Sequence, residues 1–402
     1  MKGCIALGVV CALAASAAAD DEEDVVTPPL QIHGFVTEGG FWSTANDYIG
    51  RSSRGSLELL EAAINVSSEL SDRLHVGVQI FSRVVGAYHD PPHLDWAVAD
   101  YQWQPWLGLR AGMTKMPFGL YNESMDVDAA HLPILLPQSV YPLQNRDVLR
   151  SQIGFALYGT ANLCRGGELD YQAWFGTLTI PENALTLMGA TLDSVDTKYV
   201  TGAQLLWSPP VDGLRVGAAG LRTSIDFHLT LDPRIVEQLI MAGLVPADYD
   251  GALVISQRPV MAGVASAEYT HGGWLVAAEY SRWLTHQQST LPMLLQSFDR
   301  DAERFYAMTS YRLSDRLEAG VYYSVSHADA SDRTGRDRMQ FARRYYAFQR
   351  DLAASVQLDV NERWLWKLEG HFVDGTADLQ PTTNPDPVRY WGLFLIRTTV
   401  SF

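Results

Sequence analysis

One stretch of this 402-residue sequence, positions 117–150, combines ionisable side chains of both signs with an apolar centre. Its ionisable residues are Glu123, Asp126, Asp128, His131, Arg146, Asp147 and Arg150. Carboxylates beside arginines create an electric field that acts on ions and dipolar solutes. The centre, Leu132 to Pro137, is too apolar for a loop surrounded by water, so we expect the stretch to fold into the protein. The alternative is that it covers an outer rim or contacts a neighbouring subunit.

Other patterns in the sequence give little support for catalysis. The segment from His89 to His93 places two histidines beside Asp90, but it contains two prolines and predicts a turn with few fixed neighbours, so we expect no metal site there. The sequence has no G-x-S-x-G, G-x-G-x-x-G or C-x-x-C pattern, which leaves hydrolase, dinucleotide-binding and redox functions without support. We therefore expect no catalytic residue, no metal and no cofactor.

Composition narrows the class of protein further. The net charge of −16 argues against a nucleic-acid partner, because phosphate neutralisation needs a basic face. Hydrophobic residues make up 47% and charged residues 19% of the chain, which is typical of a folded protein. Beyond the first twenty residues there is no apolar run of about eighteen residues, as a membrane-spanning helix would need.

The start of the chain predicts export. Lys2, an apolar run over 5–15 and the three alanines at 17–19 form the pattern of a secretory signal peptide, which we assign to 1–19. Cleavage there removes Cys4 and Cys11 and leaves Cys164 alone. Residues 20–30 then form an acidic segment that we expect to be solvated.

The elements that must position these side chains are strands, because apolar and polar residues alternate along the chain. In 74–80, for example, Leu74, Val76, Val78 and Ile80 share one face. The same period of two occurs in 317–326 and 351–360. A helix would need a period of 3.6 residues, which fits these segments badly.

The connections alternate between short and long. Seven short turns contain Ser71, Pro105, Gly166, Pro210, Gly272, Asp315 and Glu362. Eight long segments lie between them, at 43–55, 87–92, 117–150, 181–197, 231–257, 287–302, 329–342 and 376–388. This arrangement predicts a transmembrane antiparallel β-barrel of about sixteen strands over 31–402, with short turns on one side of the membrane and long loops on the other. Tryptophan and tyrosine residues gather near the expected strand ends, as in the aromatic girdles of such barrels.

Alternation also predicts which charges face the interior of the barrel. The inward positions include Glu61, Arg83, Arg110, Glu279, Lys367 and Glu369. Arg83 and Arg110 on one wall, opposite the carboxylates of 117–150, would produce a transverse field in the pore. For any one of these residues, the alternative is a solvated charge without a specific role.

The end of the chain carries a resemblance to a known family. The last strand, from Arg389 to Phe402, ends on a phenylalanine, with Val400, Ile396 and Phe394 at alternate positions before it. It resembles the C-terminal strand by which the barrel-assembly machinery recognises Gram-negative outer-membrane proteins. The whole mature chain resembles a bacterial porin.

A shorter passage, from Arg110 to Glu123, is similar to phosphate-selective porins and their uncharacterised relatives. After the signal peptide the chain has only three lysines, Lys115, Lys198 and Lys367, so phosphate preference does not transfer.

The resemblance implies an outer-membrane porin, a passive diffusion channel for small hydrophilic or ionic solutes. It also implies a homotrimer surrounded by outer-membrane lipid, with 20–30 in the periplasm and 117–150 as the inward-folded constriction loop. The alternative is an outer-membrane barrel that acts as an enzyme or adhesin and whose pore is incidental. Helical spacing in 233–244 predicts a loop helix that plugs the pore, gates it or packs on the barrel, and we expect it on the outer loops rather than as a gate.

Overall fold

The computed structural model describes residues 29–143, 146–180, 189–337 and 343–402, without the side chain of Asp147. The predicted signal peptide at 1–19 and most of the acidic segment at 20–30 lie outside these residues. The described residues form sixteen strands: β1 Leu30–Ser43, β2 Ser56–Ser71, β3 Leu74–Val85, β4 Tyr88–Gln104, β5 Leu107–Lys115, β6 Ser151–Asn162, β7 Glu168–Leu178, β8 Ala190–Ser208, β9 Leu214–Leu231, β10 Ala252–His271, β11 Trp274–Ser289, β12 Phe298–Ser314, β13 Leu317–His327, β14 Phe348–Asn361, β15 Trp364–Gly375 and β16 Tyr390–Ser401.

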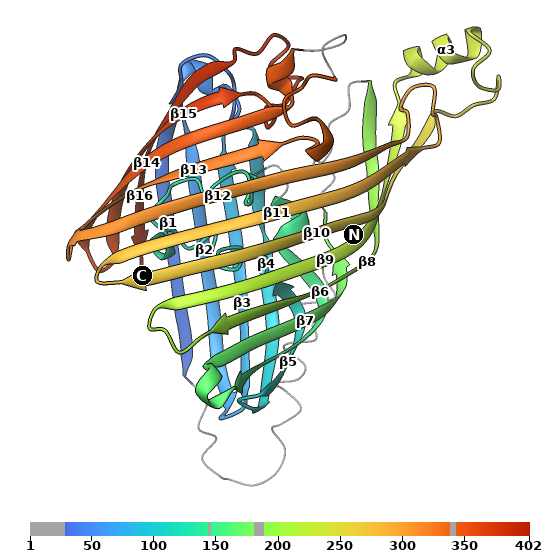
Figure 1. Cartoon of the computed structure of the whole chain (residues 1–402). Helices are drawn as coiled ribbons and strands as arrows, with labels where there is room; N and C mark the ends of the chain where they lie inside the picture. Colours follow the sequence, from blue (N-terminus) through green and yellow to red (C-terminus); the bar gives the residue numbers. More distant parts are fainter. Residues whose placement is uncertain (1–28, 144–145, 181–188, 338–342) are drawn as a thin grey trace, which may run out of the picture.

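The strands form one closed antiparallel barrel, as predicted (Figure 1). Each strand pairs with its neighbours in the sequence, and β1 closes the sheet against β16 in a register that places Phe35 opposite Ser401. Closure leaves no unpaired strand edge, which is the condition for a sheet to span a hydrocarbon layer.

Side chains alternate between the two faces of the wall. On β3, Val78 and Ile80 are exposed on the outer face, whereas Gln79 and Phe81 are buried on the inner face. On β16, Phe394 is exposed and Leu395 is buried. Apolar residues therefore cover the outside of the barrel while most charged strand residues point inward.

The seven short turns all lie at one end of the barrel, which we call the short-turn end, and the longer connections lie at the long-loop end. The prediction of a long loop at 87–92 is wrong, because β4 begins at Tyr88. Arg83 pairs with Asp90 across β3 and β4, and the two prolines lie in the bulge between that pair and the pair of Phe81 with His93. The loops predicted at 181–197, 231–257 and 287–302 are shorter than expected, because β8, β10 and β12 begin earlier and continue pairing with their neighbours.

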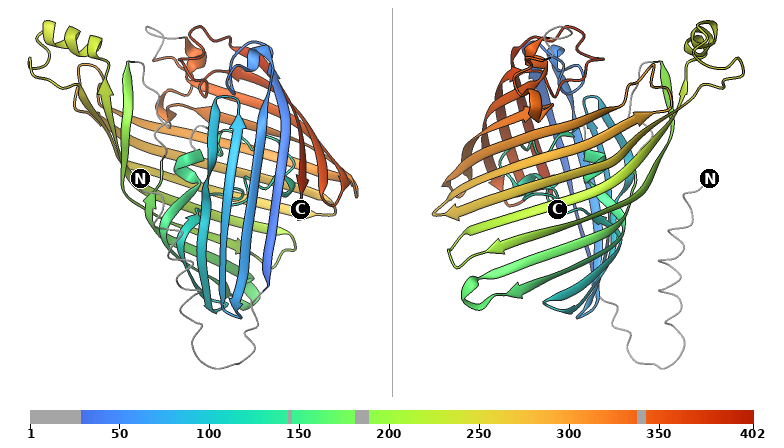
Figure 2. Two further views of the ribbon diagram at one scale, coloured as in Figure 1. Left: turned by 180° about the vertical axis from the view of Figure 1, so that it is seen from behind. Right: turned by 45° about the vertical axis from the view of Figure 1, so that its right-hand side comes forward.

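In the described parts of the connections there are two α-helices. The single-turn α2, Arg146–Leu149, directly precedes β6. α3, Pro233–Met241, begins where the Asp232 side chain accepts a hydrogen bond from the backbone of Arg234. It projects sideways from the long-loop end, away from the barrel opening (Figure 2). No helix in the described part of the chain is long and apolar enough to cross a membrane.

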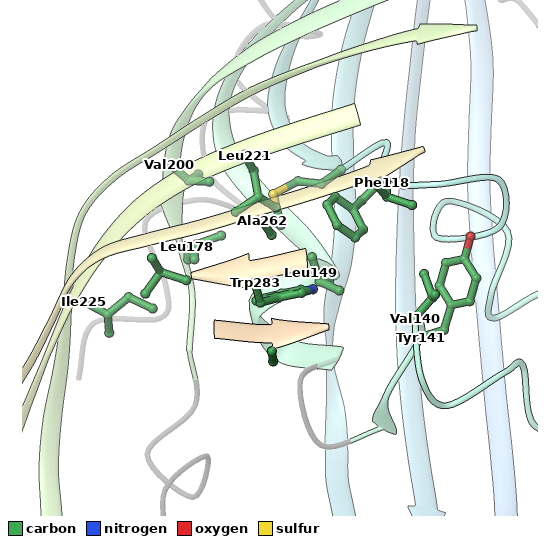
Figure 3. Packing of buried hydrophobic residues seen from close by; sticks show 14 of the residues in the cluster. Phe118, Val140, Tyr141, Leu149, Leu178, Val200, Leu221, Ile225, Ala262 and Trp283 are labelled. Carbon is green, nitrogen blue, oxygen red and sulfur yellow. The ribbon is translucent and has the colours of Figure 1, made fainter. Parts of the chain in front are cut away.

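The interior of the barrel holds an apolar cluster as well as charges. Inward-facing residues of β8–β11, among them Leu221, Ala262 and Trp283, pack with Phe118 from the connection between β5 and β6 (Figure 3). The wall is therefore apolar on its inner face in this region, and a segment of the chain must cover it.

Candidate functional site

The connection between β5 and β6, residues 116–150, is called the inner loop here, and its described residues, 116–143 and 146–150, lie inside the barrel. The rings of Phe118 and Trp283 meet edge to face, with centroids 5.9 Å apart. Ile134 and Leu135 are buried in a second cluster with Leu393 and Val373 of the barrel wall. These contacts confirm that the loop folds inward and exclude the alternative that its apolar centre covers an outer rim.

Glu279 on β11 fastens one end of the inner loop. Its carboxylate, 2% exposed, accepts hydrogen bonds from the backbone N–H of Leu120 at 2.9 Å and from the hydroxyl of Tyr141. It also accepts from Ser266 and, at 2.8 Å, from Tyr306 on the wall. A buried carboxylate needs such donors, because an unpaired charge in a dry interior is strongly unfavourable. Here the loop supplies two of them.

Lys367 on β15 fastens the middle of the loop. Its ammonium group is fully buried and donates to the carboxylate of Asp128 at 2.8 Å and to the backbone carbonyl of His131 at 2.6 Å. Asp128 also accepts from the hydroxyl of Thr399 at 2.6 Å and lies near Arg397. Burial alone would raise the pKa of Asp128, but Arg397 and Lys367 outweigh it and hold that pKa well below its ordinary value. The carboxylate therefore stays ionised.

Glu369, also on β15, fastens the apolar centre. Its two oxygens accept hydrogen bonds from the backbone N–H groups of Ile134 at 2.7 Å and Leu135 at 2.9 Å. Ser355 donates to the same carboxylate at 2.7 Å, and His371 contacts it at 3.0 Å. An apolar loop segment thus satisfies two backbone donors with one strand carboxylate.

The opposite side of the inner loop is tied to β4 and β5. Asp126 contacts Arg146 of α2 and accepts from Lys115 at 2.8 Å. Lys115 also lies 3.4 Å from Asp95 on β4, and Arg150 contacts His93 at 2.7 Å. The loop is therefore held from two sides of the barrel rather than from one.

The predicted charges of the loop have different environments. Glu123 is exposed, whereas Asp126, Asp128 and Arg146 are buried in the contacts above. The side chain of Asp147 lies outside the described residues. Only Glu123 among the described loop carboxylates is thus placed to act on a passing ion.

His131 is a buried member of the inner loop. Its ring nitrogens contact the backbone carbonyls of Pro133 and Met125 at 3.1 and 3.3 Å. Burial lowers its pKa from 6.5 to about 4, and the nearby Lys367 acts in the same direction. The imidazole is therefore neutral at neutral pH.

The predicted lumen charges all point inward, but each has a partner. Arg83 pairs with Asp90 at 2.6 Å, and Arg110 pairs with Asp100 at 2.8 Å. Glu61 pairs with Arg397 across the closure of the barrel. The structure therefore differs from the expected row of free arginines facing loop carboxylates, because neighbouring strands supply a carboxylate opposite each arginine.

Sequence reasoning missed several residues that hold the loop. Arg397 could have been predicted, because alternation along the last strand places its side chain on the inward face together with that of Thr399. Asp95 could not have been predicted in this way, because it is the extra residue of a bulge in β4, between the partners of Gln79 and Ile80, and the bulge interrupts the alternation. Tyr141 could not be identified from the sequence, because a loop residue does not follow the alternation of inward and outward side chains that strands show.

The two larger cavities among the described residues that flank the inner loop lie toward opposite ends of the barrel. One of about 130 Å³ lies toward the long-loop end and is lined by residues that include Tyr48, Arg300, Arg304 and Asp378. The other, about 170 Å³, lies toward the short-turn end, with His131, Arg312 and Glu318 among its lining residues. No group of three potential metal ligands occurs among the described residues.

Comparison with known proteins identifies the fold. No family model matches the sequence, and a search of curated proteins finds no match. Among solved structures, the chain resembles the anion-selective porin from Comamonas acidovorans, with TM-score 0.57, 10% identity and coverage of 94% of this chain and 100% of that one. It also resembles the outer membrane channel DcaP of Acinetobacter baumannii, with TM-score 0.56, 9% identity and coverage of 96% and 100%.

A third similar structure is OmpT of Vibrio cholerae, with TM-score 0.55, 12% identity and coverage of 93% of this chain and 97% of that one. At these identities the likeness shows a porin-like sixteen-strand barrel. It does not extend to the phosphate-selective group.

Proposed function

We propose that this chain is an outer-membrane porin, a passive diffusion channel for small hydrophilic or ionic solutes, narrowed by its inner loop. The observation that carries the proposal is how the inner loop is held inside the closed barrel. Glu279 and Glu369 accept hydrogen bonds from its backbone, and Lys367 forms an ion pair with its Asp128. A loop that merely capped the barrel would not need buried charges from three inner-wall positions. A constriction does, because its width must stay fixed while solutes pass.

In this proposal the short-turn end faces the periplasm and the long-loop end faces outside, as in bacterial outer-membrane barrels. The chain would be exported by its predicted signal peptide. No residue takes a catalytic role, and phosphate preference is not part of the proposal.

We also propose that copies associate in the membrane, as the resemblance to homotrimeric porins implies. Glu38 on β1 is exposed on the outer wall beside the apolar Val36, and its register partners are Leu60 and Thr398. A carboxylate facing hydrocarbon is unfavourable, so protein contact would shield it. Cross-linking of the purified chain in detergent should give a trimer, and Glu38→Leu should leave the monomeric barrel folded.

The function is tested by conductance of the refolded mature protein in a planar bilayer. Folding is checked by a β-rich circular dichroism spectrum and by gel migration that changes on boiling. We expect discrete, ohmic channels. A folded protein that inserts and passes no current would contradict the proposal.

The constriction is tested by Lys367→Met, with Lys198→Met on β8 as the matched control. Removing Lys367 leaves Asp128 buried with fewer partners, which costs about 3 kcal/mol of loop docking. We expect larger and noisier conductance for Lys367→Met only, because the side chain of Lys198 is exposed on β8. Equal conductance in both variants would show that the inner loop does not limit the current.

A further inference from the structure

The cavity of about 130 Å³ at the long-loop end has the chemistry of a binding site. It lies between the inner loop and the wall, with Tyr48 and Tyr88 on one side and Arg300 and Arg304 of β12 on the other. Both arginines point inward, on the same face of β12 as the buried Ala302 and Tyr306. The volume accommodates about four water molecules, or a small organic solute in their place.

The charge of this cavity is positive. Arg300 and Arg304 contribute two cations. The facing acid is Asp378, in the connection after β15, and burial raises its pKa. One carboxylate therefore faces two guanidinium groups.

A polar atom at this cavity lacks a partner. Nε of Arg304 is buried and has no hydrogen-bond acceptor among the described residues, although another nitrogen of the same group contacts the carbonyl of Ser139 at 3.4 Å. A buried donor without an acceptor is unfavourable, so the geometry favours an acceptor supplied from outside.

The remaining lining distinguishes between kinds of anion. Besides the two tyrosine rings, Ile49, Pro142 and Leu143 line the cavity and offer apolar contact. Inorganic phosphate has no apolar part, so the apolar lining would stay in contact with water around the ion. A carboxylate with an apolar body would cover that lining instead. The planar guanidinium group matches a carboxylate through two parallel hydrogen bonds.

We propose that this cavity is a subsite for a small organic carboxylate on its way through the channel from the long-loop end. The inference rests on the proposed channel function and names the class of solute that this passage would favour. Arg300 and Arg304 bind the carboxylate, and Tyr48 and Tyr88 contact its apolar body.

The test is calorimetric titration of the refolded full-length mature chain in detergent with benzoate as the probe. Arg300→Gln removes the exposed cation of the pair, and Arg304→Lys keeps the charge but loses the planar donor pair. The matched control is Arg312→Gln, an inward arginine of the same strand that lines the other cavity. We expect benzoate binding to weaken about tenfold in the first two variants and to remain within about twofold in the control.

Phosphate provides the second arm. Weaker binding of inorganic phosphate than of benzoate supports the organic carboxylate, whereas equal or tighter phosphate binding overturns it. A parallel loss in Arg312→Gln, or no benzoate binding to the parent protein, also overturns the proposal. In bilayers, benzoate added at the long-loop side should reduce the current, and Arg300→Gln should abolish that block.

Binding and conduction are measured separately, so the two proposals fail separately. A conducting protein that does not bind benzoate refutes the subsite alone. A protein that binds benzoate but passes no current refutes the channel alone.

Discussion

At the scale of single residues, the inward charges of this barrel serve two purposes. Glu279, Lys367 and Glu369 are buried against the inner loop and hold it in place. Arg110 is partly exposed, with 30% of its side chain accessible, and Glu123 is exposed on the loop. Only charges of the second kind can act on passing ions, because a buried ion pair presents little field to the lumen.

Ion preference should therefore respond to Glu123 and Arg110. Glu123→Gln should move the reversal potential under a salt gradient toward anions, and Arg110→Gln should move it toward cations. The interaction of a fixed unit charge with an ion 4 Å away in water amounts to about 1 kcal/mol. This energy corresponds to about a fivefold change in the ratio of anion to cation permeability. The shifts should shrink near 1 M salt, where screening shortens to about 3 Å.

The comparison variants for this prediction are Asp126→Asn and Asp128→Asn. Both carboxylates hold the loop, so these changes should alter the size and noise of the conductance first. If Glu123→Gln and Arg110→Gln both keep the parent's reversal potential, these two residues do not set the selectivity.

Acid should loosen the inner loop through His131. Its pKa is lowered to about 4 in the docked loop, from 6.5 when the loop is free. The undocked state therefore binds the proton first, so docking is fully stable above pH 6.5 and weakens as the pH falls toward 4. The difference between the two pKa values of His131 corresponds to about 3 kcal/mol of the free energy of loop docking.

Conductance recorded between pH 7 and pH 4 checks this effect. The parent should become noisier on acidification, and His131→Gln should reduce the change over that interval. Asp128, whose pKa is also lowered, adds a loss at still lower pH. An unchanged pH profile in His131→Gln would exclude His131 as the cause.

At the scale of elements, the connections differ in what they do. The inner loop enters the barrel because its apolar residues find apolar inner-wall residues on β8–β11. α3 has a buried Leu239 but leaves Met241 exposed, and it lies outside the opening (Figure 2). The expectation that the loop helix lies on the outer loops agrees with this position.

Removing α3 should therefore leave the channel intact. The backbone of Leu231 donates to the carbonyl of Gly251, so a two-residue Asn-Gly turn can replace residues 232–250 between them. We expect the shortened protein to fold and to show the parent's conductance in the bilayer. A marked rise or fall in single-channel current would instead assign α3 to the permeation path.

At the scale of the whole molecule, the barrel is closed by its two ends. Backbone groups of Phe402 and Gly34 exchange two hydrogen bonds of 3.0 and 3.1 Å, and the Phe402 ring lies over Gly34. A side chain at Gly34 would collide with that ring. The phenylalanine side chain is 56% exposed, at the end of the outward row that includes Val400.

Phe402→Ala should lower the amount of protein in the outer membrane and leave the conductance of each inserted channel unchanged. The reason is that the proposed assembly signal is the terminal ring, whereas closure relies on backbone bonds that alanine keeps. Phe394→Ala, on the same strand and face, is the control. Equal outer-membrane levels of the two variants would argue against an assembly role for Phe402.

The sequence by itself determined the barrel. A period of two along the strands and the alternation of short and long connections were sufficient to predict the number of strands and their antiparallel order. They also predicted, for most side chains, the face of the barrel wall from which each one projects. These features are local, because alternation follows from the geometry of an extended chain and needs no knowledge of distant partners. The apolar centre at 132–137 likewise indicated that the loop turns inward.

Only the tertiary structure decided which charges act together. Asp128 and Lys367 are far apart in the sequence, and their contact depends on where a long loop crosses the barrel. Asp90 and Asp100 form ion pairs with Arg83 and Arg110 that alternation alone did not predict, because strand register places them side by side on adjacent strands. Parity gives the side of the wall on which a residue lies, whereas its partners follow from strand register, bulges and the path of the loop, which are set by packing across the whole barrel.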